Sequence, residues 1–278
     1  QVAHSVFKVP TKIARIRSQS YLQPGFQDLF SQDHLPIDVI ISPELEVGKA
    51  VLRRLAVPGA FDILNFADGK VSVVGVTLEE DCPIVNTPLR QLTDLFPDLK
   101  SRVVGIVRNG ELFVPQSDDP MLVGDEAYFA ADVRDVRRTL GIFGHEETAA
   151  RRIIIVGAGN IGLHVARELE TNHPGTRVKL IENDREKAVQ AADKLKRSIV
   201  LHGDGLDPEL LQEAGIAETE TLVTLTNNDQ ANILSCVVAK REGCQRTMAL
   251  INNNTYAPLM RALGIDAFIN PRGATVST

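Results

Sequence analysis

A glycine-rich turn that directly follows an apolar run is the feature that most constrains how this chain can fold. Residues 153–162 read IIIVGAGNIG, so a GxGxxG pattern stands between an expected strand and an expected helix. In such a turn Gly157 permits the sharp bend, Gly159 lets the backbone approach a pyrophosphate, and Gly162 lets the helix pack closely on the strand. The unpaired N–H groups and the dipole at the start of the helix favour an anion. The motif therefore predicts a nucleotide-binding turn in a parallel α/β sheet.

The part of the chain that follows this turn alternates regularly between short apolar runs and helical stretches. Continuous apolar strands separated by helices are typical of a parallel sheet that is covered on both faces. We therefore expect a doubly wound, Rossmann-like α/β domain. Its strands are predicted at residues 152–156, 177–181, 198–201, 221–226, 248–251 and 267–269.

The middle of the chain has a different pattern, which is typical of antiparallel hairpins. Two dipeptides, Asp68-Gly69 and Asn109-Gly110, each separate a pair of apolar runs. Both dipeptides suit the positive φ angles of tight hairpin turns. This region therefore indicates a small α+β domain with antiparallel pairing. Its hairpin strands are predicted at residues 61–67 with 70–78 and at 102–108 with 111–114, and its helices at 87–95 and 133–143.

Two segments near the start of the chain are echoed near its end, in the same order. The run IARIRSQSY at 13–21 is echoed by MALINNNTY at 248–256, and PIDVIISP at 36–43 by GIDAFINP at 264–271. Generic strand-to-helix junctions would also produce such echoes, but two in one order favour a duplication. The expected parts of the chain are the end of a first Rossmann-like unit (1–57), the small domain (58–143), a linker (144–151) and a second Rossmann-like unit (152–278).

The composition excludes several classes of protein. The net charge of −6 argues against nucleic acid as a partner, because binding a polyphosphate needs dense Lys and Arg. Three cysteines without a CxxC pair indicate neither a disulfide framework nor a thiolate zinc site, and they favour a reducing, cytoplasmic compartment. No run approaches the ~20 apolar residues that a membrane span needs. The chain begins at Gln1 without an initiator Met, so we expect it to be an internal piece of a longer protein.

Polar side chains follow the predicted second, third and fourth strands of the Rossmann-like unit. Glu182 closes the second strand, where an acidic side chain accepts hydrogen bonds from ribose hydroxyls and repels a 2′-phosphate, which favours NAD over NADP. Asp204 follows the third strand, and Thr226 and Asn227 follow the fourth, at the edge where such sheets bind ligands. Helix capping is the alternative role for these three residues, and it is the role we expect for Asp184.

The chain offers no recognisable catalytic machinery. It contains neither a GxSxG nucleophile elbow nor a P-loop lysine motif. Once the Rossmann-like units and the hairpin domain are placed, no substrate domain remains to hold a His, Lys or Tyr at a nicotinamide. We therefore expect a protein that is not an enzyme. Two alternatives stay open, namely an NAD-dependent oxidoreductase whose catalytic domain lies outside this piece, and a scaffold with a vestigial glycine turn.

Longer motifs beyond the glycine turn resemble a known family. HGDGLDPELLQEAGI at 202–216, LVTLTNNDQANILSCVVAK at 222–240 and the stretch from IARIRSQSY to PIDVIISPE are similar to the TrkA family of cytosolic regulatory subunits of bacterial Trk potassium uptake systems. Members of this family carry two tandem RCK units, each a Rossmann-like nucleotide-binding domain followed by a small C-terminal domain. The resemblance covers essentially the whole chain and implies that organisation here.

The resemblance implies a sensor and not an enzyme. It implies that the chain binds NAD or NADH, with ADP or ATP as further candidates. It also implies a homo-oligomer, a dimer or a tetramer ring, that assembles against a membrane potassium-translocating subunit at the inner face of the plasma membrane. The implied nucleotide contacts are Gly157, Ala158, Gly159, Asn160, Ile161, Gly162, Glu182, Thr226 and Asn227, with Asp204 as a further candidate.

The chain also departs from the family pattern at three places. Arg15 matches a position that faces nucleotide in the first unit, but its counterpart in the second copy is Leu250, so the resemblance implies two unequal sites. The glycine turn and the ribose-binding acid of the first unit are not in this sequence, which leaves Arg15 without a complete site. Asn160 stands where some ring-forming relatives place an Arg that reaches a terminal phosphate, which argues against a triphosphate clamp.

Overall fold

A computed structural model describes residues 2, 6–16, 21, 29–30, 34, 36–67 and 69–272. The chain divides into two compact units, one formed by Gln1–Val51 with Arg151–Thr278 and the other by Leu52–Ala150. The predicted domain boundaries after residues 57, 143 and 151 stay predictions. Among the described residues, no helix combines the length and the apolar character that crossing a membrane would require.

The first unit contains a six-stranded sheet in which every pair of neighbouring strands is parallel. The strand order β10-β9-β8-β11-β12-β13 runs outward in both directions from β8 and β11. This is the order of a doubly wound Rossmann fold, and such folds bind ligands where the order reverses, at the carboxyl ends of the central strands. The strands are β8 (Arg152–Val156), β9 (Arg177–Glu182), β10 (Ile199–His202), β11 (Thr221–Thr224), β12 (Arg246–Leu250) and β13 (Ala267–Ile269).

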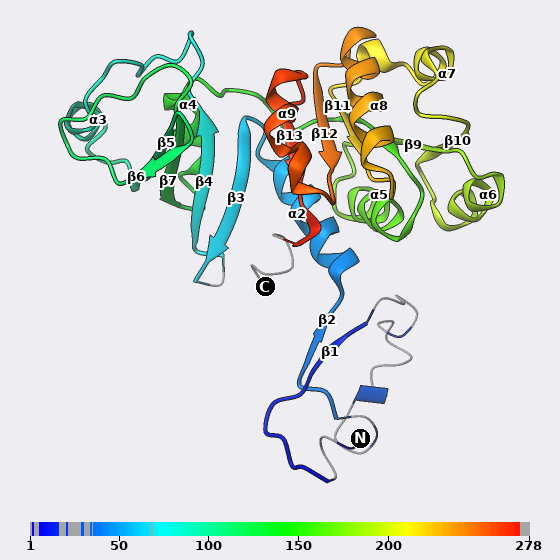
Figure 1. The fold of residues 1–278 in the computed structure, drawn as a ribbon. Helices are drawn as coiled ribbons and strands as arrows, with labels where there is room; N and C mark the ends of the chain where they lie inside the picture. The colour runs from blue at the N-terminus through cyan, green and yellow to red at the C-terminus, as the bar shows by residue number, and fades with distance from the viewer. Residues whose placement is uncertain are drawn as a thin grey trace. The chain divides into compact units, whose positions relative to one another are not determined.

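Helices cover both faces of this sheet, so the predicted fold class is confirmed (Figure 1). On one face α7, α8 and α9 share a core with the sheet, in which Leu211, Cys236 and Met260 pack with Ile154 and Leu222. On the opposite face lie α5 and α6 (Figure 1). The helices are α5 (Asn160–Asn172), α6 (Arg185–Lys194), α7 (Pro208–Glu213), α8 (Asp229–Arg241) and α9 (Ala257–Ala262), with the short helices η3 (Ile216–Glu218) and η4 (Asn254–Tyr256).

The second unit is built on a five-stranded antiparallel sheet with the order β3-β4-β7-β5-β6. Both predicted hairpins are present, but a strand that the sequence pattern did not reveal, β7, lies between them and pairs with each. Along β7 the residues Ala127, Phe129 and Ala131 are buried and form part of the core. The elements are β3 (Ala60–Phe66), β4 (Val71–Thr77), α3 (Leu89–Leu95), β5 (Ser101–Arg108), β6 (Glu111–Phe113), β7 (Glu126–Asp132) and α4 (Val136–Ile142).

The turns of the two hairpins depend on residues that tolerate a positive φ angle. Asn109 and Gly110 have φ angles of 53° and 82°, which confirms the turn predicted for this dipeptide. In the other hairpin Gly69 has a φ angle of 79°, while Asp68 lies outside the described residues.

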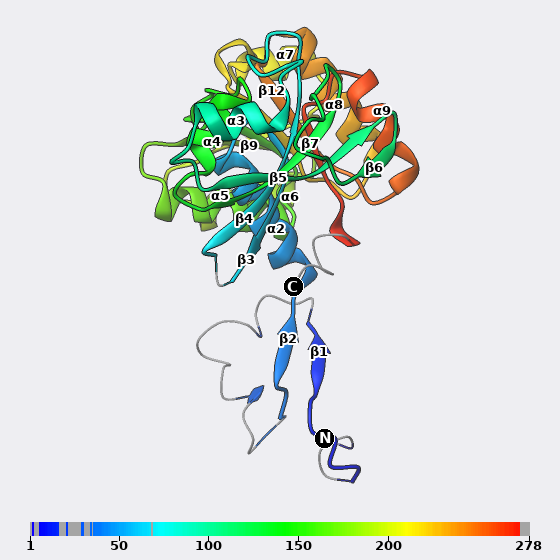
Figure 2. The same cartoon turned by 90° about the vertical axis from the view of Figure 1, so that its left-hand side faces the viewer.

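The start of the chain repeats the geometry of the end of the six-stranded sheet. Strands β1 (Ile13–Arg15) and β2 (Val39–Ile41) form a parallel pair (Figure 2), and helix α2 (Pro43–Ala56) follows. Arg15 stands opposite Ile41 in this pair, as Leu250 stands opposite Ile269 between β12 and β13. The register is thus the one that the sequence repeat predicts, and it confirms the tail of a first Rossmann-like unit. Residues 17–20 of the repeat and most of 22–35 lie outside the described residues.

One side-chain contact is also the same in both copies. The carboxylate of Asp38 accepts a hydrogen bond of 2.7 Å from the backbone N–H of Lys12. Its counterpart Asp266 accepts one of 2.7 Å from the backbone N–H of Thr247. In each copy the acid therefore ties the start of the outer strand to the strand beside it.

Candidate nucleotide-binding site

The first glycine of the turn occupies a backbone conformation that side chains rarely adopt. Gly157 has a φ angle of 106°, and a Cβ atom there would lie 3.1 Å from the backbone of Leu225 and Thr226. The N–H of Gly157 donates to the carbonyl of Ile181 over 2.8 Å. The turn is thus held between the ends of β9 and β11, and glycine is required at this position.

The other two glycines differ in what surrounds them. A Cβ atom on Gly162 would lie 2.0 Å from the carbonyl oxygen of Gly157, so this glycine lets α5 pack against the turn. A Cβ atom on Gly159 would meet no described atom within 4 Å. Gly159 has an ordinary φ angle of −65°, so glycine is not required there for backbone reasons. The open space beside Gly159 is where a ligand can approach the backbone.

Helix α5 begins without a side-chain cap from any described residue. Gly159 occupies the N-cap position, and the first intrahelical bond runs from the N–H of Leu163 to the carbonyl of Gly159 over 2.9 Å. The three N–H groups of residues 160–162 precede that bond, so the helix itself gives them no acceptor. By contrast α6, α7 and α8 are capped by the side chains of Asp184, Asp207 and Asn228. The start of α5 therefore presents free donors and the positive end of a helix dipole, which suits an anionic group.

Glu182 lies beside these donors at the end of β9. Its side chain is buried, with 7% of the residue exposed. Oε2 accepts a hydrogen bond of 2.6 Å from the N–H of Ala158, and Oε1 accepts one of 3.0 Å from the N–H of Asp184. Each carboxylate oxygen can accept more than one hydrogen bond, so both can still receive a hydroxyl from a ligand.

The ends of β8, β9, β10 and β11 surround a cavity of about 420 Å³. This volume lies in the range of small-molecule sites. Six of the residues predicted from the sequence line it, namely Gly157, Gly159, Glu182, Asp204, Thr226 and Asn227. The cavity therefore opens at the carboxyl edge of the sheet, where the strand order reverses.

The remaining predicted residues lie elsewhere. Ala158, Asn160, Ile161 and Gly162 belong to the turn and to the first residues of α5 without lining the cavity, and Ala158 reaches Glu182 through its N–H group. Arg15 lies on β1, in the separate two-stranded sheet, and is not among the residues that line the cavity.

Asp184 and Asp204 both accept hydrogen bonds from backbone N–H groups near the start of a helix. Asp184 caps α6 as expected, since its side chain accepts from the N–H groups of Glu186 and Lys187. The hydrogen bond from Lys187 leads the contacts that hold the pKa of Asp184 below its ordinary value. Asp204 accepts a hydrogen bond of 2.9 Å from the N–H of Leu206 and so stabilises the turn before α7, whose cap is Asp207.

Thr226 belongs to a hydrogen-bond network that the sequence pattern did not reveal. Its hydroxyl donates to Oδ1 of Asn232 over 2.7 Å and accepts from the N–H of Asn228 over 3.2 Å. Asn232 is fully buried and also donates from Nδ2 to the carbonyl oxygens of Thr226 and Leu250. Asn232 thus fixes the loop after β11, which forms one wall of the cavity, to the end of β12.

A neighbouring carboxylate fixes the next loop in a similar way. Asp229 accepts three hydrogen bonds of 2.9 Å, from the N–H and Nδ2 of Asn252 and from the N–H of Asn253. Burial alone would raise the pKa of Asp229, but these hydrogen bonds hold it below its ordinary value. In the sequence both networks show only as polar residues at the start of a helix, Asp229 and Asn232, and nothing local indicates that these residues are buried. The cavity is also lined by residues that no sequence motif marked as site residues, among them Asn183, Lys187, Gly205 and Ser235.

Comparison with known families agrees with this geometry. Residues 153–271 match the TrkA-N domain and residues 73–144 match the TrkA-C domain. Among solved structures, the GsuK RCK domain is similar at a TM-score of 0.61 and 17% identity, over 96% of this chain and 55% of that chain. The GsuK channel bound to NAD is similar at a TM-score of 0.59 and 17% identity, over 96% of this chain and 45% of that chain. These likenesses show the fold.

Relatives of known name are similar over the whole chain. The Trk system potassium uptake protein TrkA of Azorhizobium caulinodans is 55% identical over 277 residues. The proteins of the same name from Halomonas elongata and Vibrio alginolyticus are 38% and 37% identical. Each match covers 100% of this chain and 60% of the relative, so the chain spans about 60% of the length of the relatives it matches. With a TrkA-C domain followed by a TrkA-N domain and this similarity throughout, the chain belongs to the TrkA family.

Proposed function

We propose that this chain is part of a regulatory subunit of a potassium uptake system and that it binds an adenine nucleotide at the carboxyl edge of its six-stranded sheet. NAD or NADH is the proposed ligand, with ADP or ATP as further candidates. The observation that carries the proposal is the uncapped start of α5, which lies beside the open space at Gly159 and the buried carboxylate of Glu182.

The residues around the cavity fit such a nucleotide. The pyrophosphate would bind to the N–H groups at the start of α5, because they are free and the helix dipole favours negative charge there. The hydroxyls of the adenosine ribose would donate to Glu182, whose charge disfavours a 2′-phosphate at the same place. Asp204 would face the adenine, and Thr226 with Asn227 would line the side of the second ribose. The names of the similar proteins support this reading, since one of them is a channel bound to NAD.

We further propose that nucleotide binding controls a membrane potassium-translocating partner. A ligand can shift a protein between two conformations only if it binds them with different affinities. A homo-oligomer, as a dimer or a tetramer ring at the inner face of the plasma membrane, would transmit that difference to the transporter. The division of the chain at residues 57, 143 and 151 is part of this proposal. Arg15 is assigned to a separate site in the first Rossmann-like unit, residues 1–57. The relatives named for the Trk potassium uptake system support the choice of partner.

The test is rubidium uptake into proteoliposomes that contain the potassium-translocating subunit and the full-length regulatory protein that carries this chain. We expect NADH or ATP to change the uptake rate at least about twofold, and Gly159→Ala to abolish that change. The near-ultraviolet absorbance of NADH should stay constant in the same vesicles, since no residue is proposed to be catalytic. The proposal would be contradicted by a rubidium uptake rate that no nucleotide changes. Steady consumption of NADH in the presence of a candidate substrate would also contradict it.

A further inference from the structure

The proposed nucleotide cavity is lined by a buried hydroxyl for which the fold supplies no hydrogen bond. Ser235 lies on α8 and lines the cavity, although only 2% of the residue is exposed. Its hydroxyl forms no hydrogen bond with any other residue that the structure describes. An unpaired hydroxyl loses its bonds to water on burial, which disfavours folding. Ser235 therefore offers a ligand a donor and an acceptor that the protein does not use.

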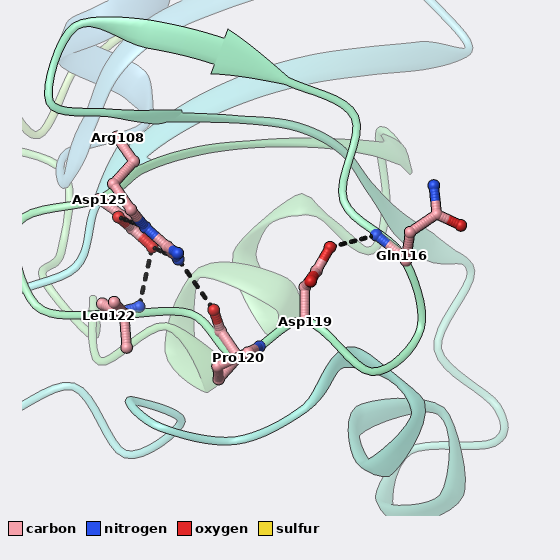
Figure 3. A network of polar contacts seen from close by, with 6 residues as sticks. All are labelled: Arg108, Gln116, Asp119, Pro120, Leu122 and Asp125. Atoms are coloured by element: carbon pink, nitrogen blue, oxygen red, sulfur yellow. Dashed lines mark hydrogen bonds and ion pairs between the residues drawn. The ribbon is translucent and has the colours of Figure 1, made fainter.

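Two comparable buried groups outside the cavity have partners within the fold. The hydroxyl of Thr139, which is also buried and on a helix, donates to the carbonyl four residues earlier over 2.9 Å. The carboxylate of Asp125 in the second unit accepts two hydrogen bonds from Arg108, over 2.8 and 2.7 Å (Figure 3). The hydroxyl of Ser42 is buried and unpaired as well, but Ser42 does not line the cavity. Ser235 combines an unpaired buried hydroxyl with a place in the wall of the cavity.

The loop after β10 leaves this hydroxyl uncovered. A Cβ atom on Gly205 would lie 3.4 Å from Oγ of Ser235 and 2.4 Å from Cγ1 of Val156. Gly205 does not have a positive φ angle, so the backbone conformation does not require glycine there. Glycine is needed because the loop passes close to Val156. A side chain at residue 205 would also contact the hydroxyl, so the glycine keeps Ser235 open to a ligand.

The surroundings of Ser235 suit a flat and largely apolar base. Residues three or four apart share one face of a helix, and Asn228, Ala231 and Ser235 line the cavity from one face of α8. Mostly apolar walls with a few placed polar groups are typical of small-molecule sites. The buried apolar residues at the ends of β8 and β9 and just after β11 that line this cavity are Val156, Ile181 and Leu225.

We propose that Ser235 selects the base of the nucleotide, by donating a hydrogen bond from its hydroxyl to a ring nitrogen of adenine. The inference rests on the proposed function and adds to it the residue that recognises the base. With the ribose at Glu182 and the pyrophosphate at the start of α5, the base would extend between the loop after β10 and α8. Ser235 lies there beside Gly205, which follows Asp204, the residue proposed to face the adenine.

The test measures nucleotide affinity by calorimetry on the purified 278-residue chain and on Ser235→Ala. The control is Ser198→Ala, which removes a hydroxyl just before β10 that does not line the cavity. The ligand is NAD or ADP, whichever binds the unchanged chain more tightly. We expect Ser235→Ala to bind it about tenfold more weakly, and Ser198→Ala to bind it within about twofold of the unchanged chain.

Three analogues of the same nucleotide identify the contact, because each replaces one accepting ring nitrogen of adenine, at position 1, 3 or 7, with C–H. We expect one analogue to bind the unchanged chain about tenfold more weakly than its parent. Ser235→Ala should bind that analogue and the parent within about twofold of each other, since the hydroxyl that distinguishes them is gone. The inference is overturned if Ser235→Ala discriminates against all three analogues as strongly as the unchanged chain does.

Stability separates this role from a structural one. Because the hydroxyl is unpaired in the protein, Ser235→Ala should unfold at a urea concentration no lower than that of the unchanged chain. A lower midpoint without nucleotide would assign the hydroxyl to the fold and would overturn the inference. Equal nucleotide affinity in Ser235→Ala would overturn this inference alone, whereas no binding of NAD or ADP to the unchanged chain would overturn the proposed function with it.

Discussion

The carboxylate of Glu182 accepts a hydrogen bond of 2.6 Å from the backbone N–H of Ala158, so the end of β9 is joined to the glycine turn. The same carboxylate accepts from the N–H of Asp184, where the loop to α6 begins. A single buried acid thus fixes two backbone segments beside the proposed nucleotide. The shape of the site therefore depends on the position of Glu182, and the proposed selectivity for a nucleotide depends on its charge.

Replacing this acid should change which dinucleotide binds. Gln at residue 182 has one acceptor oxygen in place of two, so its NH₂ group would face one of the two N–H donors that Glu182 now accepts. We expect Glu182→Gln to weaken NAD binding about tenfold to a hundredfold and to narrow the preference for NAD over NADP. Fluorescence titration with both dinucleotides measures this.

Glu213→Gln is the matched control for that change, because Glu213 is exposed on α7 and does not line the cavity. Its affinity for NAD should equal that of the unchanged chain. An unchanged NAD to NADP ratio in Glu182→Gln would remove Glu182 from the proposed ribose contact.

The three glycines of the turn should differ in how alanine affects folding. At Gly157 alanine would adopt a positive φ and approach Leu225, which should lower the free energy of unfolding by about 2 kcal/mol. At Gly162 the clash with the carbonyl of Gly157 should lower it by about 3 kcal/mol. At Gly159 the change should stay within about 0.5 kcal/mol, because the added methyl group meets open space. Urea denaturation gives the three values, and a loss at Gly159 equal to that at Gly157 would contradict this account of the turn.

The buried amide of Asn232 should contribute strongly to stability. It accepts two hydrogen bonds from Thr226 and donates one each to the carbonyl oxygens of Thr226 and Leu250. Asn232→Ala would leave the carbonyl of the buried Leu250 without this donor and would remove three hydrogen bonds to Thr226, so we expect a loss of about 3 kcal/mol in the free energy of unfolding. Asn172→Ala is the control, because Asn172 is exposed at the end of α5. Thermal denaturation of the two variants measures the difference in stability. Equal midpoints for the two variants would contradict the proposed role.

The ion pair of the second unit should make its stability depend on pH. Burial alone would raise the pKa of Asp125, but the hydrogen bonds from Arg108 and from the N–H of Leu122 hold it below its ordinary value. A depressed pKa stabilises the fold above the unfolded value of about 3.9, and that stability is lost as the pH falls through the folded pKa. We therefore expect Asp125→Asn to cost about 3 kcal/mol at neutral pH and progressively less below about pH 4.

Urea denaturation at several pH values checks this expectation, with Asp118→Asn as the control. Asp118 pairs with Arg90 at the surface, where both side chains are more than half exposed, so its replacement should cost no more than about 0.5 kcal/mol. A cost of Asp125→Asn that is the same at pH 3 and pH 7 would show that the ionised pair is not the cause.

Much of the fold could be predicted because its signals are local. Alternating apolar runs and helical stretches mark each strand of the parallel sheet, and Asn109-Gly110 marks its hairpin turn. Strand β7 was missed because EAYFAAD is rich in alanine, so it lacks the β-branched residues that signal a strand. What makes it a strand is its place between β4 and β5, which no local pattern reports.

The candidate site also contains both residues that the sequence predicts and residues that it does not. Glu182 could be predicted because its place at the end of the second strand follows from the fold. Asn232 could not be predicted, because its partners are the backbone carbonyl groups of Thr226, just after β11, and of Leu250, at the end of β12. Its sequence shows only a polar residue on a helix, and the burial that gives that residue its role comes from tertiary packing.

Calorimetric titration of the chain with NADH, NAD, ADP and ATP tests the central claim most directly, which is that the glycine turn binds an adenine nucleotide. The comparison is Gly159→Ala, with Gly175→Ala as control, since Gly175 is exposed in a loop and a Cβ atom there meets nothing within 4 Å. We predict one nucleotide bound per chain, no measurable binding to Gly159→Ala at unchanged stability, and full binding to Gly175→Ala. The absence of binding for all four nucleotides, or equal binding by Gly159→Ala, would contradict the claim.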